Sequence, residues 1–284
     1  MPKRPGSWLL VGHGSVGSSL VWRLRAAGIE PGVHDPAPRI AIPDGLGLAS
    51  LGGDGRTFDV VVSCVTPSEA LAAAAATAVV SRPDTLLLDW NTLLPDVKAA
   101  LFGRTPASVV DVALLDTLDA DAAAPSLAVA GTRAGEAAAC LEALGFSVEV
   151  VGDQPGDAAR LKLARSLFMK TLEALVIEFE AAIGTLPGAD VVRHSIERNT
   201  GATFAEFARL LLRTDRVHAA RRAAELRGAV EVYRELGRPV ALAGAAVGTL
   251  EDAADAWARP DAPAEDASLA ELTRHLGETL DARR

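Results

Sequence analysis

Three glycines near the amino terminus have the spacing that lets a protein backbone hold a diphosphate. A short apolar run at 8–11 leads directly into a helical stretch through Gly12-His13-Gly14-Ser15-Val16-Gly17. The first glycine permits a tight turn, the second lets the backbone approach a pyrophosphate, and the third lets helix and strand pack closely. The diphosphate would lie at the amino end of the helix, held by backbone N–H groups. The pattern predicts a dinucleotide-binding turn; a purely structural glycine turn is the alternative.

An acidic residue follows the second predicted strand, 18 residues after Gly17. At that position Asp35 can accept hydrogen bonds from the adenosine ribose hydroxyls of a dinucleotide. No arginine directly follows it to hold a 2′-phosphate, and Arg39 lies four residues further on, beyond two prolines. The sequence therefore predicts NAD as the cofactor, with NADP the less favoured choice.

The third predicted strand should end where the nicotinamide half of the dinucleotide would lie. Val65, Thr66 and Pro67 follow it, in the segment VVSCVTP at 61–67. Thr66 could contact the nicotinamide ribose or simply cap the following helix. Cys64 is interpreted as a small buried residue rather than a reactive thiol, because no basic neighbour would lower its pKa.

Strand-like and helical segments alternate through residues 1–153, which implies βαβ units and a mainly parallel sheet. Strands are predicted at 8–11, 32–34, 60–64, 86–88, 109–110, 127–130 and 148–151. Helices are predicted between them at 15–27, 68–80, 95–102 and 133–144. This part of the chain is predicted to be an α/β Rossmann domain that binds NAD.

After residue 153 the strand signal ends. Apolar residues recur at helical spacing through 157–183, which predicts one long interdomain helix. Further helices are predicted at 189–197, 203–212, 215–236, 240–256 and 268–281. Residues 154–284 are thus expected to form an all-α C-terminal domain for substrate binding and dimerisation.

The composition narrows the class of protein. A net charge of −9 over 284 residues repels phosphate at long range, so neither nucleic acid nor a membrane surface is an expected partner. No apolar run approaches the ~20 residues of a transmembrane helix. The two cysteines are far apart, which suits a reducing compartment, and we expect a cytoplasmic protein. His194 and His218 lack metal-ligand partners at useful spacing, so no metal is expected.

Four segments together resemble the 6-phosphogluconate dehydrogenase-like β-hydroxyacid dehydrogenases, a family that includes 3-hydroxyisobutyrate dehydrogenases, glyoxylate reductases and imine reductases. They are GHGSVG at 12–17, VVSCVTP at 61–67, DWNT with Pro95 at 89–95, and GDAARLKLARSLFMK at 156–170. The last segment is most similar to a poorly characterised phosphogluconate dehydrogenase-like branch. The resemblance implies a homodimer, places Asn91 and Thr92 beside the nicotinamide, and makes Lys162 the catalytic acid/base.

The substrate half departs from the family pattern. Leu114-Leu115-Asp116 replaces a substrate-binding Ser-Gly-Gly, Arg165 replaces an asparagine, and Ala224-Glu225 replaces a later Lys-Asp pair. The resemblance therefore transfers well to the cofactor half and poorly to the substrate half.

Lysines are scarce in this chain, which otherwise uses arginine for positive charge. Lys162 and Lys170 are two of only four lysines, and both lie on the long predicted helix. A lysine can transfer a proton to or from a substrate oxygen if burial and neighbouring cations lower its pKa. Arg165 and Ser166 share the helix face of Lys162. We therefore predict Lys162 as catalytic and Arg165, Ser166 and Lys170 as binding a small anionic substrate; a solvated cationic face is the alternative.

A second cationic stretch, further along the chain, is interpreted mainly as an ion-paired exposed face. Its positions 218, 221 and 222 share a helix face and could instead reach an anionic substrate from the partner subunit. It comprises Arg209, Arg213, Arg216, His218, Arg221, Arg222 and Arg227.

The predicted function is an NAD(P)-dependent dehydrogenase or reductase acting on CH–OH. It would move a hydride between nicotinamide and a small hydroxy acid or the matching carbonyl compound. Imine reduction is an alternative, against which the retained Lys162 counts, because the proton donor in those relatives is usually not lysine. A non-catalytic NAD-binding protein is a third reading, suggested by the lost substrate motifs.

Overall fold

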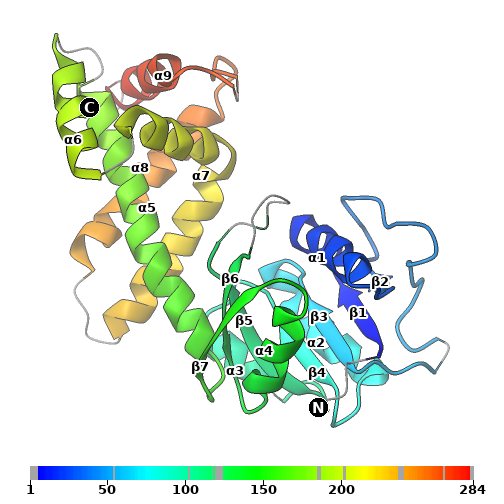
Figure 1. The fold of residues 1–284 in the computed structure, drawn as a ribbon. Helices are drawn as coiled ribbons and strands as arrows, with labels where there is room; N and C mark the ends of the chain where they lie inside the picture. The colour runs from blue at the N-terminus through cyan, green and yellow to red at the C-terminus, as the bar shows by residue number, and fades with distance from the viewer. Residues whose placement is uncertain are drawn as a thin grey trace. The chain divides into compact units, whose positions relative to one another are not determined.

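The computed structural model describes residues 6–53, 55–101, 103–116, 118, 124–183, 187–200, 203–235, 240–264 and 266–281. The chain forms two compact units, Met1–Lys162 and Leu163–Arg284. In Figure 1 the first runs from blue to green and the second from green to red. The predicted helix ends at 102 and 236 fall outside the described residues.

The first unit is built on a seven-stranded sheet with the order β2-β1-β3-β4-β5-β6-β7. Every neighbouring pair is parallel except β5 and β6, which are antiparallel. The predicted α/β class with a mainly parallel sheet is confirmed. The strands are β1 (Trp8–Val11), β2 (Gly32–His34), β3 (Val60–Ser63), β4 (Leu86–Asp89), β5 (Ser108–Leu114), β6 (Ser126–Ala130) and β7 (Ser147–Gly152).

Both faces of this sheet are covered by helices, which explains why the central strands β3 and β4 are apolar up to their last residues, Ser63 and Asp89. Trp8 and Leu10 of β1 pack on one face with residues of α1 (Ser15–Ala26) and α4 (Ala134–Glu142). Leu9 and Val11 pack on the other face with residues of α2 (Ala70–Ala76) and α3 (Pro95–Leu101). The single helix predicted at 68–80 is wrong in detail, because two 3₁₀ segments, η1 (Pro67–Glu69) and η2 (Thr77–Val80), flank α2.

The strand order places a topological switch point between β1 and β3. From β1, the chain winds to β2 on one side and later to β3 on the other. In open α/β sheets, ligands bind outside the carboxyl ends of the strands at such a point. Here the N–H of Cys64 donates to the carbonyl of Val11 at 2.9 Å, so the segments that follow β1 and β3 begin side by side.

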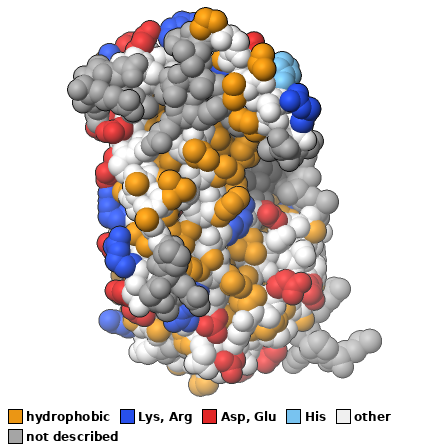
Figure 2. Space-filling view, turned by 90° about the vertical axis from the view of Figure 1, so that its left-hand side faces the viewer, with side chains coloured by type: hydrophobic (Ala, Val, Ile, Leu, Met, Phe, Trp, Pro, Cys, Tyr) orange, Lys and Arg blue, Asp and Glu red, His pale blue; other side chains and the backbone are white. Residues whose placement is uncertain are grey.

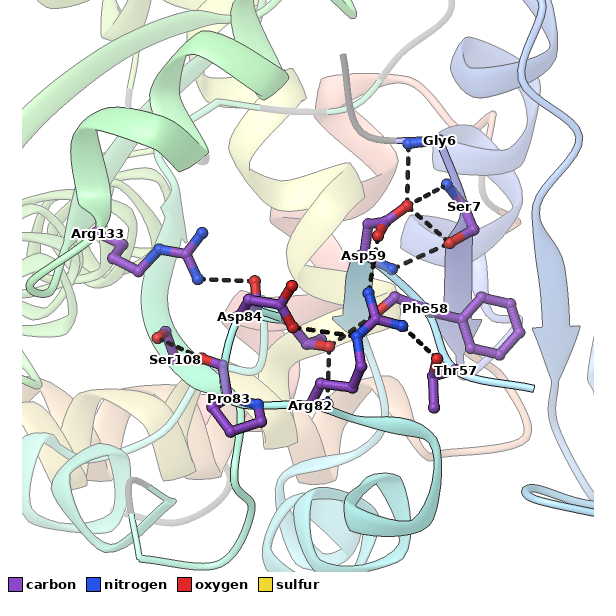
Figure 3. A network of polar contacts seen from close by, with 11 residues as sticks. Gly6, Ser7, Thr57, Phe58, Asp59, Arg82, Pro83, Asp84, Ser108 and Arg133 are labelled. Atoms are coloured by element: carbon purple, nitrogen blue, oxygen red, sulfur yellow. Dashed lines mark hydrogen bonds and ion pairs between the residues drawn. The ribbon is translucent and has the colours of Figure 1, made fainter. Parts of the chain in front are cut away.

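A polar network fastens the opposite edge of the sheet, where β1, β3 and β4 begin (Figure 3). One oxygen of Asp59 accepts N–H bonds from Gly6 at 3.1 Å and Ser7 at 2.9 Å. Arg82 contacts the other oxygen at 3.0 Å and also pairs with Asp84 at 3.1 Å. Burial raises the pKa of Asp59, but the hydrogen bonds from Ser7, Arg82 and Gly6 outweigh it and lower that pKa overall. The network holds the strand starts together, far from the carboxyl ends.

The second unit is helical, as predicted. Its helices are the greater part of α5 (Asp157–Ile183), then α6 (Ala189–Thr200), α7 (Phe204–Glu235), α8 (Ala241–Trp257) and α9 (Leu269–Asp281). Four of them bury one apolar cluster that includes Ile177, Leu226, Leu250 and Leu272. None of the described helices is long and apolar enough to cross a membrane.

Two helices predicted at 203–212 and 215–236 are in fact one, α7, so that prediction is wrong. The residues between them break nothing. The Thr214 hydroxyl donates back to the carbonyl of Leu210 at 2.9 Å, a bond that fits inside a helix. Asp215 does not cap a new helix either, because its carboxylate is buried and accepts the indole N–H of Trp257 at 2.7 Å.

Candidate active site

Each glycine of the predicted turn is constrained differently. Gly12 has a φ of +99°, and a Cβ there would lie 2.5 Å from the carbonyl oxygen of Cys64. A Cβ at Gly17 would overlap the carbonyl oxygen of Gly12. A Cβ at Gly14, in contrast, would meet no described atom within 4 Å. The fold itself thus requires Gly12 and Gly17, whereas Gly14 adjoins open space, as expected where backbone approaches a phosphate.

The amino end of α1 continues this turn. The helix begins at Ser15, and neither a side-chain cap nor an acidic residue occupies its first turn. Ser15 is exposed and Val16 is partly buried. The N–H groups of that first turn can therefore serve an anion, and the helix dipole favours negative charge there.

Asp35 lies directly beyond β2, and backbone donors fix its carboxylate. One oxygen accepts the N–H of His13 at 2.7 Å, and the other accepts the N–H of Ala37 at 2.9 Å. The His13 ring contacts the carbonyl of Ile40 at 2.9 Å, which ties the following loop to the glycine turn. The residues present fit a dinucleotide: open space at Gly14, an uncapped helix end and an oriented carboxylate.

The segment after β3 contributes structure more than reactivity. Burial raises the pKa of Cys64 to about 12, with smaller contributions from Asp35 and Asp89, and its sulfur lies 3.1 Å from the carbonyl oxygen of Gly12. This supports its interpretation as a buried structural residue. Val65 is partly buried, Pro67 starts η1, and the Thr66 hydroxyl contacts that of Ser68 at 3.0 Å. Thr66 makes no side-chain cap bond to the helix that follows.

Asn91 and Thr92 follow β4, and the structure brings Lys162 to Thr92. The amide nitrogen of Asn91 donates to Ser63 Oγ at 2.9 Å and to the carboxylate of Asp89. The hydroxyl of Thr92 accepts a 2.9 Å hydrogen bond from Lys162 Nζ, across 70 positions of sequence. The Asn91 side-chain oxygen is buried and has no hydrogen-bond partner among the described atoms.

The first turns of α5 are held against the same edge of the sheet. The N–H of Ala159, three residues before Lys162, donates to Asp111 Oδ2 at 2.8 Å. Gly156 has a φ of +90°, and a Cβ there would lie 2.9 Å from Pro95. The helix therefore starts in close contact with the segment that carries Thr92.

The other residues predicted to bind substrate belong to the second unit. Arg165 is exposed and Ser166 is buried. Lys170 forms a 3.0 Å ion pair with Glu225. Burial lowers the pKa of Lys170 more than Glu225 raises it, whereas Lys170 and Arg221 lower the pKa of Glu225 despite its burial.

The second cationic stretch is largely ion-paired or bonded to backbone. Arg221, which is exposed, pairs with the partly buried Glu225, and Arg227 pairs with Glu251 between exposed positions of α7 and α8. Arg222 differs, because it is partly buried and pairs with the buried carboxylate of Glu173. Ion pairs thus account for Arg221, Arg222 and Arg227, whereas Arg209 and Arg216 donate to backbone carbonyls.

Sequence reasoning missed a buried ionic cluster beside Asn91. Lys98 Nζ lies 2.5 Å from Asp89 Oδ2 and 2.9 Å from Asp111 Oδ1, and all three side chains are at most 2% exposed. Burial lowers the pKa of Lys98, but the two carboxylates raise it by more than burial lowers it. The net shift of the pKa is therefore upward, and the ammonium stays charged. The available signal was a lysine in an arginine-rich chain together with an acid on each of two consecutive strands. Within the described ranges, no group of three or more His, Cys, Asp or Glu could hold a metal ion.

No protein-family model matches the chain. An uncharacterised 28.5 kDa protein of Methanothermus fervidus is 26% identical over 172 residues, which span 60% of this chain and 66% of the relative, just under two thirds of its length. A conserved hypothetical protein from Sinorhizobium meliloti 1021 has a similar solved structure, with a TM-score of 0.72, 25% identity and 96% of both chains covered. A conserved protein of unknown function, described as structurally similar to 3-hydroxyacid dehydrogenases, matches with a TM-score of 0.69 and 26% identity. The match covers 88% of this chain and 97% of that protein.

Solved enzymes share the fold at lower identity. A 3-hydroxyisobutyrate dehydrogenase from Salmonella typhimurium matches with a TM-score of 0.68 and 16% identity over 94% of this chain and 99% of its own. An imine reductase from Myxococcus stipitatus, in complex with NAD⁺, matches with a TM-score of 0.58 and 19% identity. The match covers 96% of this chain and 100% of the imine reductase. A reductive aminase from Aspergillus terreus, in complex with NADPH, matches with a TM-score of 0.56 and 16% identity. The match covers 98% of this chain and 99% of the aminase. The chain is thus similar in fold to 3-hydroxyacid dehydrogenase-like proteins, as the resemblance of its four short segments predicted.

Proposed function

We propose that the protein is an NAD(P)-dependent oxidoreductase acting on CH–OH, with a small hydroxy acid or the matching carbonyl compound as substrate. The observation that carries the proposal is the 2.9 Å hydrogen bond from Lys162 Nζ to the Thr92 hydroxyl. Thr92 follows β4 and the glycine turn follows β1, and these strands run parallel through β3. A side chain that is chemically able to transfer a proton thus lies at the sheet edge where a dinucleotide would bind.

Different residues are proposed to bind different parts of the dinucleotide. The turn from Gly12 to Gly17 would hold the diphosphate, and Asp35 the adenosine ribose. The residues beside the nicotinamide half would be Val65, Thr66, Pro67, Asn91 and Thr92. When bound, the nicotinamide accepts or supplies the hydride. NAD is preferred because the Asp35 carboxylate, held by two backbone donors, would repel a 2′-phosphate.

Lys162 would act on the substrate oxygen. As an ammonium it donates a proton to the oxygen of a carbonyl compound that is being reduced; as an amine it accepts one from a hydroxyl that is being oxidised. Thr92 orients it by accepting its hydrogen bond. Arg165 and Ser166 are proposed to bind an anionic group of the substrate. The ion pair with Glu225 weakens the case for Lys170.

A homodimer formed through the helical unit is also proposed. Many hydrophobic side chains lie at the surface on the face shown in Figure 2. Large apolar side chains of α5, α7 and α8 are more than half exposed, at Phe168, Leu175, Leu210, Val217 and Leu242. Exposed apolar side chains that gather on one surface mark interaction sites, and these five residues are the ones proposed to form the dimer interface. Light scattering should give a dimer for the wild type and a monomer for Phe168→Glu; a monomeric wild type would refute this. Both cysteines are free thiols, which suits a cytoplasmic location.

An assay over hydroxy acids, aldehydes and cyclic imines, with NADH, NADPH and their oxidised forms, tests the function. We expect turnover of a hydroxy acid or carbonyl compound that Lys162→Ala abolishes. Turnover of imines alone would favour an imine reductase. No turnover of any compound, with NADH bound tightly, would favour a non-catalytic NAD-binding protein.

A further inference from the structure

The buried cluster of Lys98, Asp89 and Asp111 joins three separate elements of the first unit. Asp89 ends β4, Asp111 lies within β5, and Lys98 lies on α3. Besides its two ion pairs, Lys98 Nζ donates to the backbone carbonyl of Asp89 at 2.8 Å. The contact with Asp111 is a 2.9 Å ion pair rather than a well-aligned hydrogen bond.

Every carboxylate oxygen in this cluster has a partner. Lys98 contacts one oxygen of each carboxylate, the Asn91 amide donates to the second oxygen of Asp89, and the Ala159 N–H donates to the second oxygen of Asp111. One ammonium and two carboxylates leave a net charge of −1. Without Lys98, two adjacent carboxylates would be buried with no cation, an arrangement that repels strongly in a low-dielectric interior.

The two neutral donors lead from this cluster to the proposed proton donor. Asn91 directly precedes Thr92, and Ala159 lies three residues before Lys162 on α5. The hydrogen bond between Lys162 and Thr92 then closes the ring. The ring runs from Lys98 through Asp89, Asn91 and Thr92 to Lys162, and returns through Ala159 and Asp111.

We propose that Lys98 is a positioning residue: by pairing with Asp89 and Asp111 at once, it holds in place the two anchors that bring Lys162 and Thr92 into hydrogen-bond distance. Its catalytic meaning rests on the proposed function, but its effect on Lys162 does not. Lys98 itself is buried and touches neither cofactor nor substrate in this assignment.

The chemical reactivity of Lys162 tests the proposal without any substrate. Acetic anhydride labels accessible lysines, and Arg160 and Arg165 flank Lys162, so trypsin releases it in a short peptide for mass spectrometry. In Lys98→Met, Lys162 should be labelled about fivefold faster, the factor for one lost hydrogen bond of typical net strength. Lys170, ion-paired in the other unit, should keep its rate and serves as the internal reference.

Arg82→Met is the matched control. Arg82 is also a cation between two carboxylates of the first unit, but it lies at the opposite edge of the sheet (Figure 3). It should leave Lys162 labelling unchanged. A folded Lys98→Met protein with a normal Lys162 rate would overturn the proposal. Equal acceleration of Lys162 and Lys170 would also overturn it, because that indicates general loosening.

Asp111→Asn provides the same test if Lys98→Met does not fold. An amide has one acceptor oxygen, so it cannot serve both the Lys98 ammonium and the Ala159 N–H, while the Lys98–Asp89 pair remains. Lys162 labelling should again accelerate, and an unchanged rate would count against the proposal.

Kinetics provide the second readout. In Lys98→Met, kcat should fall about 100-fold, within the range of general acid–base assistance, while NADH affinity stays within about threefold. Unchanged kcat would overturn a catalytic consequence of this positioning. If the wild type turns over no compound but the labelling behaves as expected, the proposed function fails and the positioning role stands.

Discussion

The backbone N–H of His13 donates a 2.7 Å hydrogen bond to the carboxylate of Asp35. The second residue of the glycine turn thus holds the acid that ends the β2 segment, and Ala37 holds its other oxygen. This links the diphosphate and ribose positions of the proposed dinucleotide site.

Cofactor preference follows from this carboxylate. NADH should bind at least about tenfold more tightly than NADPH, a difference of ~1.4 kcal/mol, because Asp35 opposes a 2′-phosphate. Asp35→Ser should narrow this difference in affinity, because it weakens NADH binding and removes the repulsion between the carboxylate and the 2′-phosphate of NADPH. Fluorescence titration of both proteins with both cofactors measures this. NADPH binding tenfold more tightly to the wild type would contradict the assignment.

Substitution by alanine should have different effects at two glycines of the same turn, on stability at Gly12 and on cofactor binding at Gly14. Gly12→Ala should lower the melting temperature, because its Cβ meets the Cys64 carbonyl at 2.5 Å and its φ is +99°. Gly14→Ala should leave the melting temperature unchanged and weaken NADH binding about tenfold or more, since its Cβ enters only open space where the diphosphate would lie. Thermal unfolding and cofactor titration separate the two. Unaltered NADH affinity in Gly14→Ala would contradict the assignment of the diphosphate to this turn.

Removal of Lys162 should abolish turnover and spare the cofactor. Lys162→Ala should lose ~10²–10⁴-fold in kcat, the range of general acid–base assistance. NADH affinity should change less than about threefold, or ~0.7 kcal/mol. Lys170→Ala should lose much less, because Lys170 is engaged with Glu225. If Lys170→Ala lost activity and Lys162→Ala kept it, the wrong lysine has been assigned.

Asp215 should make the helical unit less stable as pH rises from about 4 to about 7. Burial raises its pKa to about 7, against an opposing hydrogen bond from Trp257. An unfolded aspartate titrates near 4, so between about pH 4 and 7 the folded state holds a proton that the unfolded state has lost. The stabilisation is complete below that window and disappears as pH rises to about 7. Arg222, at 3.9 Å, limits the size of the effect.

Urea unfolding at pH 5 and pH 8 checks this prediction. Asp215→Asn keeps an acceptor for Trp257 and stays neutral, so relative to wild type it should gain stability at pH 8. Glu251→Gln, which alters an exposed acid paired with Arg227, is the control and should show little change. An equal difference between Asp215→Asn and wild type at both pH values would mean that Asp215 is charged throughout.

Local patterns in the sequence determined the parts of the fold that depend on neighbouring residues. The bounds of β1 and β2 and of the long helix α5 agree with the prediction, because apolar periodicity and flanking glycines specify them within a short window. The spacing of Gly12, Gly14 and Gly17 and the position of Asp35 likewise identified the turn before any contact was known. The continuous α7 was missed, since only the burial of Asp215 against Trp257 shows that no helix starts there.

The tertiary structure decided which distant side chains meet. Lys162 reaches Thr92 across 70 residues, and Ala159 reaches Asp111 across 48. Lys98 is one of few lysines in the sequence, but its two carboxylate partners are set only when α3 packs it against Asp89 of β4 and Asp111 of β5. Parallel strands are joined by crossovers of a dozen or more residues, so side chains that meet at their ends are far apart in the chain and no local pattern records them. The glycine turn could be read from the sequence; the ring that holds Lys162 exists only in the fold.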